Sequence, residues 1–544
     1  MTILFLFKSY ISCIVLTMSL IKSITTVGGF TLLSRIVGFV RDILIAKFLG
    51  ASMMADAFFV ALRFPNLFRS LFAEGTLNVA FVPLFSGELH EKGKSGALLF
   101  AKAVFSFLFY VLLIFTVLME IFMPSFMFIL APGFESIPGK LELTTSLSRI
   151  TFPFLLCVSL VSLLSGVLNS VGKFWAAAFT PTLLNLMMIG ALYIITPFVN
   201  NPYAPAYALS IGVCLAGFLE LVWLLYYVKK EGLLFGLLGP VKALIHMGGN
   251  VKLLLKRMGP GVLGSGVYQI NLFLDTLFVS FVGAGAISWL NYAHHMFQLP
   301  IGIIGVAIGI ALLPVLSKHI KAGEKEEANT QINRGLEISL AMSIASMIGL
   351  ALLAHPIIAV LFERGAFTMN DTLQTSKALI MFSIGLPAYM MTKALSPFFY
   401  ARGDTVTPVK IAIFGVALNA ALALTLMQFY GFVGIAAATG ITVWVNAIQY
   451  MYRLKRQGEF SLDATFKYRL PRIVAAGVTM GVCLLLTLRF FAGCYPNWQH
   501  ETNLHSVLLL GLLVFIGAAV FALVLIGSGG IPLNEIKRFI RRGK

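Results

Sequence analysis

The sequence predicts an all-α polytopic membrane protein with about fourteen transmembrane helices. Of its 544 residues, 59% are hydrophobic and 11% are charged, whereas a soluble domain carries roughly 25% charged residues. The mean hydropathy is +0.92, and the apolar runs are long enough for spans of roughly 20 residues each. The loops between them are short, so no separate soluble domain is predicted.

The apolar runs follow one another along the whole chain. They lie near residues 24–49, 55–88, 97–131, 144–170, 175–199, 203–228, 251–282, 285–317, 333–361, 372–400, 408–430, 431–452, 470–492 and 504–527. The second run contains Arg63, Pro65, Arg69 and the Glu74-Gly75 pair. Proline and clustered charges interrupt a membrane helix, so this run is predicted to be kinked or broken.

Lysine and arginine gather in alternate loops, which sets the orientation. Residues 229–257, 453–472 and 537–544 are rich in both, whereas 132–143 and 493–503 contain few. Basic loops remain in the cytoplasm, so both termini are predicted to be cytoplasmic. These loops account for most of the net charge of +18, and no nucleic-acid partner is predicted.

The five scattered cysteines indicate neither a disulfide framework nor a zinc site.

Three pairs of segments repeat at an offset of about 230 residues. "GASMMADAFF" resembles "GAGAISWLNYAHH", "AFVPLFSGELHEKG" resembles "ALLPVLSKHIKAGE", and "SVGKFWAAAFTP" resembles "YARGDTVTP". We therefore predict two parallel six-helix lobes, 18–230 and 231–456, with a substrate site between them, as in secondary transporters. Residues 457–544 would add two C-terminal helices and a basic cytoplasmic tail. Residues 1–17 are interpreted as an upstream extension before Met18, or at most an interfacial segment.

The first two spans carry charges that are costly in a bilayer. The first contains Arg35, Arg41 and Asp42, and the second contains Asp56, Arg63, Arg69 and Glu74. One arginine facing lipid costs about 2.5–3.5 kcal/mol on insertion scales, so these side chains must face each other, water or a ligand. Pairing among themselves is the alternative, but three acids leave one of the four arginines in excess.

Clustered guanidinium groups favour an anionic ligand. Arginine stays charged in any environment and binds phosphate through parallel hydrogen bonds. A cationic cavity in a repeat transporter therefore indicates a phosphate or diphosphate substrate. His294 and His295 occupy the corresponding place in the second lobe, either as cavity residues or as neutral hydrogen-bonded groups.

Asp275, Asn419 and Thr439 form a second polar set in the second lobe. Their oxygen atoms suit a monovalent cation, and the alternative is hydrogen bonding between helices. No phosphate-binding loop, paired catalytic carboxylates or Ser/His/Asp arrangement was found, so no enzymatic activity is predicted.

Several long motifs closely resemble the MurJ/MviN family of lipid II flippases, in the multidrug/oligosaccharidyl-lipid/polysaccharide exporter superfamily. They are "LLSRIVGFVRD", "DAFFVALRFPNLFRSLFAEG", "AFVPLF", "TPTLLNLMMIG" and "YARGDTVTPVKIA". The resemblance runs from about Met18 to the C-terminus. It implies fourteen helices, with the last two forming a groove for a polyprenyl tail. It also implies export of the undecaprenyl-diphosphate-linked peptidoglycan precursor to the periplasmic leaflet by alternating access.

The resemblance also implies a set of substrate-binding residues. Arg35, Arg41 and Arg69 would bind the diphosphate, with Ser34, Asp42, Asp56 and Glu74 beside them and Pro181 and Asn185 lining the cavity.

The family commonly has an arginine where His295 stands. Our hypothesis is that His295 keeps a weaker, pH-sensitive contact; a His295→Ala variant that transports normally at every pH would contradict it.

The remaining expectations concern energy, partners and rival functions. No cofactor is predicted; the membrane potential, worth about 2.3 kcal/mol per charge per 100 mV, and a monovalent ion would drive transport. The expected partners are lipid II, membrane lipids and cell-wall synthesis machinery.

Two alternative transport functions stay open. One is export of another polyprenyl-diphosphate-linked glycan. The other is that of a drug antiporter of the same superfamily, whose cavity should carry acidic residues instead of arginines. A wall-synthesis enzyme would need acidic residues on a large outer loop, and the outer loops are short.

Overall fold

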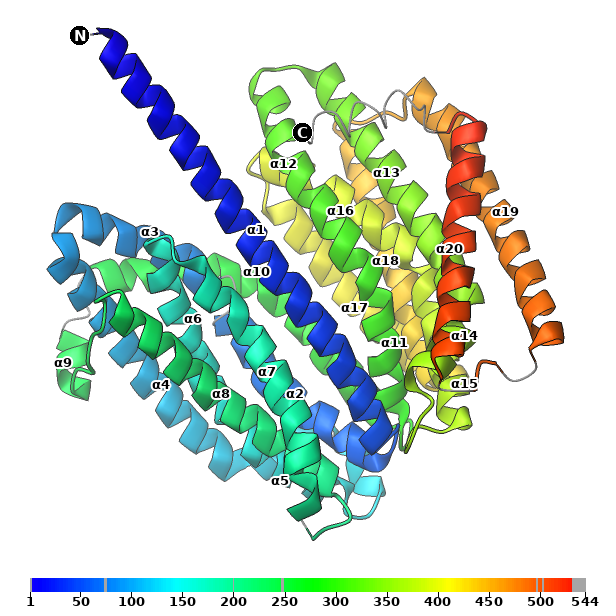
Figure 1. Ribbon diagram of the computed structural model, residues 1–544, viewed down its shortest axis with the longest axis horizontal. Coiled ribbons are helices and arrows are strands. Elements are labelled where there is room, and N and C mark those ends of the chain that lie inside the picture. The colour runs from blue at the N-terminus through cyan, green and yellow to red at the C-terminus, as the bar shows by residue number, and fades with distance from the viewer. Residues whose placement is uncertain are drawn as a thin grey trace. The chain divides into compact units, whose positions relative to one another are not determined.

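The structure is a computed structural model that describes residues 2–72, 76–198, 200–245, 249–495, 498–500 and 503–530. All regular secondary structure in these ranges is helical (Figure 1). The chain divides into two compact units, residues 1–49 with 53–269, and residues 50–52 with 270–544. The division falls inside one helix, and the lobe limits at residues 230 and 456 remain a prediction drawn from the sequence repeat.

The first unit holds the N-terminal helices. They are α1 (Thr2–Leu49), α2 (Met53–Phe72), α3 (Thr76–Glu91), α4 (Gly93–Leu130), η1 (Pro132–Ser136), α5 (Lys140–Thr151), α6 (Phe154–Ser170), α7 (Phe174–Ile194), η2 (Thr196–Phe198), α8 (Ala204–Lys230), α9 (Pro240–Ile245) and most of α10 (Gly249–Ser280). Residues 2–17 belong to the same continuous helix as the first predicted span.

The second unit contains the rest of α10 and the C-terminal helices. They are α11 (Ala286–Pro300), η3 (Ile301–Gly305), α12 (Val306–Lys321), α13 (Lys325–Leu352), α14 (Ala354–Phe362), α15 (Met369–Ile384), α16 (Leu386–Ala401), α17 (Val406–Tyr430), α18 (Phe432–Arg456), α19 (Ala464–Cys494) and α20 (Leu504–Gly527). The last two pack against each other as a C-terminal pair (Figure 1).

Eleven of the described helical segments are long and apolar enough to cross a membrane. The other three predicted runs coincide with α1, with α2 and α3, and with α10. The second of these runs is highly charged, because α2 carries Asp56, Arg63 and Arg69 within 20 residues. The all-helical, multi-span fold is confirmed, and the arrangement is compatible with fourteen spans.

Helix α2 runs through Pro65 as one helix up to Phe72, and α3 begins at Thr76. The Glu74-Gly75 pair lies outside the described residues, so the interruption of the second run stays a prediction. An irregularity follows Pro300, where the five residues of η3 form a π-helical turn. Proline lacks the N–H that would continue the regular hydrogen-bond pattern, and single π-turns inside α-helices are frequent at functional sites.

Aromatic packing fixes α2 within the first unit. Phe64 and Phe68 of α2 contact Phe152 at ring-centroid distances of 5.2 and 6.3 Å. Phe115 and Phe126 of α4 add contacts of 4.9 and 5.8 Å. Such tilted and edge-on pairs contribute beyond their buried area, so the helix that carries Arg69 has a defined position in this unit.

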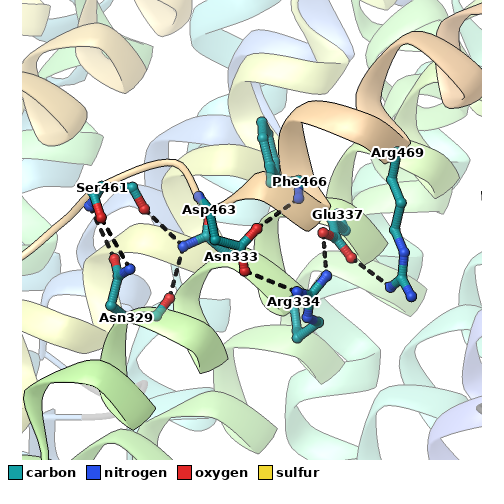
Figure 2. A network of polar contacts seen from close by, with 8 residues as sticks. All are labelled: Asn329, Asn333, Arg334, Glu337, Ser461, Asp463, Phe466 and Arg469. Carbon is teal, nitrogen blue, oxygen red and sulfur yellow. Dashed lines mark hydrogen bonds and ion pairs between the residues drawn. The ribbon is translucent and has the colours of Figure 1, made fainter.

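A polar network fixes the start of α19 to α13 in the second unit (Figure 2). Asp463 caps α19 by accepting from the backbone N–H of Phe466 at 2.6 Å, and it accepts from Arg334 at 2.8 Å. Glu337 accepts from Arg334 and, at 2.9 Å, from Arg469. Both Glu337 and Arg469 are buried, so each neutralises a charge that would be costly alone. This network ties the C-terminal pair of helices to the second unit.

Candidate functional site

Four of the predicted site residues meet between α1 and α7 in the first unit. The Nε and Nη2 of Arg41 donate to Oδ1 of Asp42 at 3.0 and 2.7 Å. Its Nη1 donates to Oδ1 of Asn185 at 2.7 Å. Asn185 in turn donates from Nδ2 to the backbone oxygen of Ser34 at 3.0 Å. We call Ser34, Arg41, Asp42 and Asn185 the arginine cluster.

Glycine makes the close approach of the two helices feasible. Asn185 is buried, and a Cβ atom at Gly38 would lie 3.2 Å from its Nδ2. A side chain at position 38 would therefore crowd the amide that orients Arg41. The contact between Arg41 and Asn185, which are 144 positions apart in the sequence, therefore depends on how closely α1 and α7 pack.

The arginine cluster leaves hydrogen-bonding capacity for a ligand. A guanidinium group has five N–H donors. The recorded oxygen contacts of Arg41 use three of them, and Nη1 also lies 3.9 Å from the weak acceptor Sδ of Met188. Its side chain is 19% exposed. Arg41 is thus held rigidly in the lobe while donors remain for an anion, which is the preorganisation that a phosphate-binding arginine requires.

Arg69 is oriented by a second asparagine. Its Nε donates to Oδ1 of Asn66, three residues earlier on α2, at 3.0 Å. The adjacent Ser70 accepts a 2.8 Å hydrogen bond from Gln269 of α10. Glu220 of α8 is 3% exposed, and the charge of Arg69 acts on it. The amide oxygen of Asn66 thus helps to orient the guanidinium group of Arg69.

Asp56 forms a completely buried ion pair. Its Oδ2 lies 2.8 Å from Nζ of Lys140, and both side chains are 0% exposed. The same Nζ lies 3.9 Å from the ring centroid of Phe134. Asp56 therefore links α2 to the start of α5 through Lys140.

The other predicted site residues of the first unit lie apart from these contacts. Arg35 and Pro181 are exposed, on α1 and α7. Glu74 lies outside the described residues. Along α1, Arg35 and Arg41 are separated by about 9 Å at 1.5 Å per residue. Cations therefore occur at more than one depth along the first span.

The second unit brings together two of the three predicted cation ligands. Nδ2 of Asn419 donates to Oδ1 of Asp275 at 2.9 Å and to Oδ1 of Asn271 at 3.1 Å. Asn271 donates to Oδ2 of Asp275 at 3.0 Å. Thr439 donates to the backbone oxygen of Ile435 on its own helix at 3.2 Å. His295 is partly buried on α11.

Sequence reasoning missed three polar residues that these sites contain. They are Asn66, Lys140 and Asn271. A signal for Lys140 was present, since it belongs to the outer loop 132–143 that is otherwise poor in basic residues. An isolated lysine in such a loop suggests a specific partner, and the structure shows this partner to be the buried carboxylate of Asp56. The two asparagines become recognisable only through their spatial neighbours.

Eleven described helical segments suited to crossing a membrane define the class as a polytopic membrane protein, and the oriented guanidinium groups of Arg41 and Arg69 are of the kind that suits an anionic ligand. The profile described as "Lipid II flippase MurJ" matches residues 45–505. A relative from Rhizobium tropici, described as a probable lipid II flippase MurJ, is 41% identical over 533 residues, 96% of this chain and 97% of the relative. The chain belongs to the MurJ lipid II flippase family.

Solved structures agree with this assignment. One described as lipid II flippase MurJ in an inward closed conformation has a TM-score of 0.73 and 28% identity, covering 92% of this chain and 97% of the other. A multidrug resistance MATE family transporter in an inward-facing conformation has a TM-score of 0.64 at 16% identity, covering 78% and 94%. The latter similarity shows a shared fold alone.

Proposed function

We propose that this protein translocates lipid II, the undecaprenyl-diphosphate-linked peptidoglycan precursor, from the cytoplasmic to the periplasmic leaflet of the bacterial inner membrane. The observation that carries the proposal is Arg41, held by Asp42 and Asn185 with N–H donors to spare. A diphosphate presents several oxygens to such a group. Membership of a family named for lipid II flippases supports this substrate.

The proposed mechanism is alternating access. The diphosphate enters from the cytoplasmic side and is neutralised by Arg35, Arg41 and Arg69, while the polyprenyl tail stays in lipid along α19 and α20. The lobes then open to the periplasm. No covalent chemistry or organic cofactor takes part, and the membrane potential contributes about 2.3 kcal/mol per charge per 100 mV. Both termini lie in the cytoplasm, and cell-wall synthesis enzymes are the partners that use the product.

The test is the exposure of labelled lipid II on the outer leaflet of cells depleted of their own flippase. Expression of this chain should restore exposure to the level given by a known flippase at matched membrane abundance. Cells carrying the empty vector should show none. A well-inserted chain that restores nothing would contradict lipid II as the substrate and favour another polyprenyl-diphosphate-linked glycan.

We also propose that a monovalent cation binds near Asp275. The residues fit such an ion in one respect: Asn419 is 2% exposed, and its Oδ1 has no recorded partner among the described residues. That oxygen, with the carboxylate of Asp275 and the amide oxygen of Asn271, forms a set of the oxygen ligands that hard cations prefer. The recorded contact of Thr439 is the hydrogen bond that it donates to Ile435, and the lone pairs of its oxygen remain able to accept a cation.

Asp275→Asn is expected to remove the effect of sodium on the purified protein. Sodium chloride should raise the unfolding temperature of the parent more than choline chloride does, because a ligand that binds only the folded state stabilises it. The neutral variant should respond equally to both salts, and Thr425→Val on α17 serves as a control. An unchanged sodium effect in Asp275→Asn would rule out this site.

A further inference from the structure

Glu220 is a buried acid that the proposed function leaves unused. It lies on α8, at least about 15 Å from either end of that helix at 1.5 Å per residue. The residue is 3% exposed, and the described residues include no hydrogen-bond or ion-pair partner for its carboxyl group. A buried carboxylate without such a partner is costly, and an ionisable residue inside a membrane span indicates a functional site.

Close packing of α8 against α6 keeps this carboxyl group inside the first unit. Gly217 lies three residues before Glu220, on the same face of α8. A Cβ atom at Gly217 would lie 2.8 Å from Cδ2 of Phe154 and 3.0 Å from Cβ of Cys157, both on α6. The two helices therefore leave no room for a side chain at this point. Burial disfavours the ionised form of a carboxyl group unless a cation on a neighbouring helix stabilises it.

Arg69 of α2 supplies the positive charge that acts on Glu220. Helix α2 packs against α8, and the two belong to the second and the sixth predicted span, so they run in the same direction. Arg69 and Glu220 each lie 16 residues after the first residue of their helix, about 24 Å, and therefore at a similar depth. Arg69 is partly exposed, so an anionic ligand can reach it. Glu220 and such a ligand would then share the charge of one arginine.

Other charged groups on the helices around α8 have interactions elsewhere. The elements packed against α8 are α1, α2, α5, α6, α7 and η2. Cys157 of α6 is buried, and the charge of Glu220 acts on it. Arg63 lies six residues before Arg69, about 9 Å along α2. Three further cations interact with other acids: Arg41 with Asp42, Lys140 with Asp56, and Arg149 with Glu120.

We propose that Glu220 takes up a proton when the diphosphate of the substrate binds Arg69, an inference that rests on the proposed function. Before binding, Arg69 stabilises the ionised carboxylate. The diphosphate then brings negative charge to the arginine, and a proton from the aqueous phase forms an O–H bond with the carboxylate of Glu220. Binding and protonation are linked reciprocally, so protonation of Glu220 also favours binding. The loaded first unit carries one negative charge fewer than it would with an ionised Glu220.

The experiment counts the protons taken up when fluorescent undecaprenyl diphosphate binds the full chain in nanodiscs of phosphatidylcholine. Calorimetry in buffers of different ionisation enthalpy gives this number. The parent should take up as much as about one proton more per ligand than Glu220→Gln, because an amide does not accept that proton. Titration of the ligand itself is common to both proteins and cancels in the comparison.

The pH dependence of binding gives a second readout. Relative to Glu220→Gln, the dissociation constant of the parent should rise with pH, by as much as about tenfold per pH unit, because one linked proton is lost. The neutral variant should bind at high pH at least as tightly as the parent does, a result that mere loss of structure would not give. Glu120→Gln is the matched control and should behave as the parent does. Glu120 is another acid inside a span with an unpartnered buried oxygen among the described residues, but the cation that acts on it is Arg149.

Equal proton uptake and equal pH dependence in the parent and in Glu220→Gln would overturn the inference and leave the proposed function intact. Infrared difference spectra of the parent, with and without ligand, provide a test that does not depend on the folding of Glu220→Gln. A ligand-dependent carbonyl band of a protonated carboxylic acid that shifts in Glu220→Asp supports the inference, and the absence of such a band overturns it. A folded parent that does not bind undecaprenyl diphosphate would contradict the proposed function and the inference together.

Discussion

Replacing Arg41 by alanine is expected to abolish lipid II export at unchanged membrane abundance. The substitution removes a guanidinium group that Asp42 and Asn185 hold in place, together with the N–H donors that remain for phosphate. Each hydrogen bond to a charged group contributes about 1.5–3 kcal/mol, so losing two reduces substrate binding on the order of a hundredfold or more. Arg41→Lys keeps the charge without the planar fork and should retain partial activity.

The loss in Arg41→Ala has a second explanation that must be separated from the first. Without Arg41, the carboxylate of Asp42, which is 8% exposed, would lose its ion pair and destabilise the lobe. The double variant Arg41→Ala/Asp42→Asn removes that unpaired charge. Export that returns in the double variant would mean that Arg41 only neutralises Asp42; export that stays lost supports phosphate binding. Lys47→Ala, on the exposed face of α1, is the matched control and should export normally.

Neutralising one member of the Asp56–Lys140 pair is expected to destabilise the first unit by about 3–5 kcal/mol. Both side chains are 0% exposed and lie 2.8 Å apart, so Lys140→Met or Asp56→Asn leaves the other charge buried without its counter-ion. Thermal unfolding of the purified protein should begin at a markedly lower temperature, and membrane abundance should fall. An unchanged unfolding temperature in both single variants would show that water reaches this pair.

The double variant Asp56→Leu/Lys140→Met separates a structural role of Asp56 from the predicted substrate contact. Replacing both members of a buried ion pair by apolar residues is often neutral for stability, so the unfolding temperature should return close to that of the parent. If export also returns, Asp56 acts by positioning α2 against α5 through Lys140. If stability returns without export, Asp56 contacts the substrate as the sequence analysis predicted.

The sequence alone was sufficient for the membrane class and the helical fold. These features follow from local properties, namely the length of the apolar runs and the low charge content. Four site residues, Ser34, Arg41, Asp42 and Asn185, were also named in advance, and the structure brings them together. The motifs that resemble the family supplied Ser34 and Asn185, because an uncharged side chain in an apolar run carries no charge signal of its own.

The partners of these residues depended on the tertiary structure. From the charges in the sequence, Asp56 was considered as a partner for the arginines of the first two spans. The structure records an ion pair between Asp56 and Lys140, 84 residues away. Likewise Asp275 was matched with Asn419, but Asn271 on its own helix completes the set. A direct ion pair or hydrogen bond forms only when the two groups lie within about 3–4 Å, and packing decides which groups come that close. The sequence by itself determined that the first two spans contain more arginines than acids, and the fold decided that Asn185 contacts Arg41 and that Lys140 pairs with Asp56, because these partners are distant in sequence.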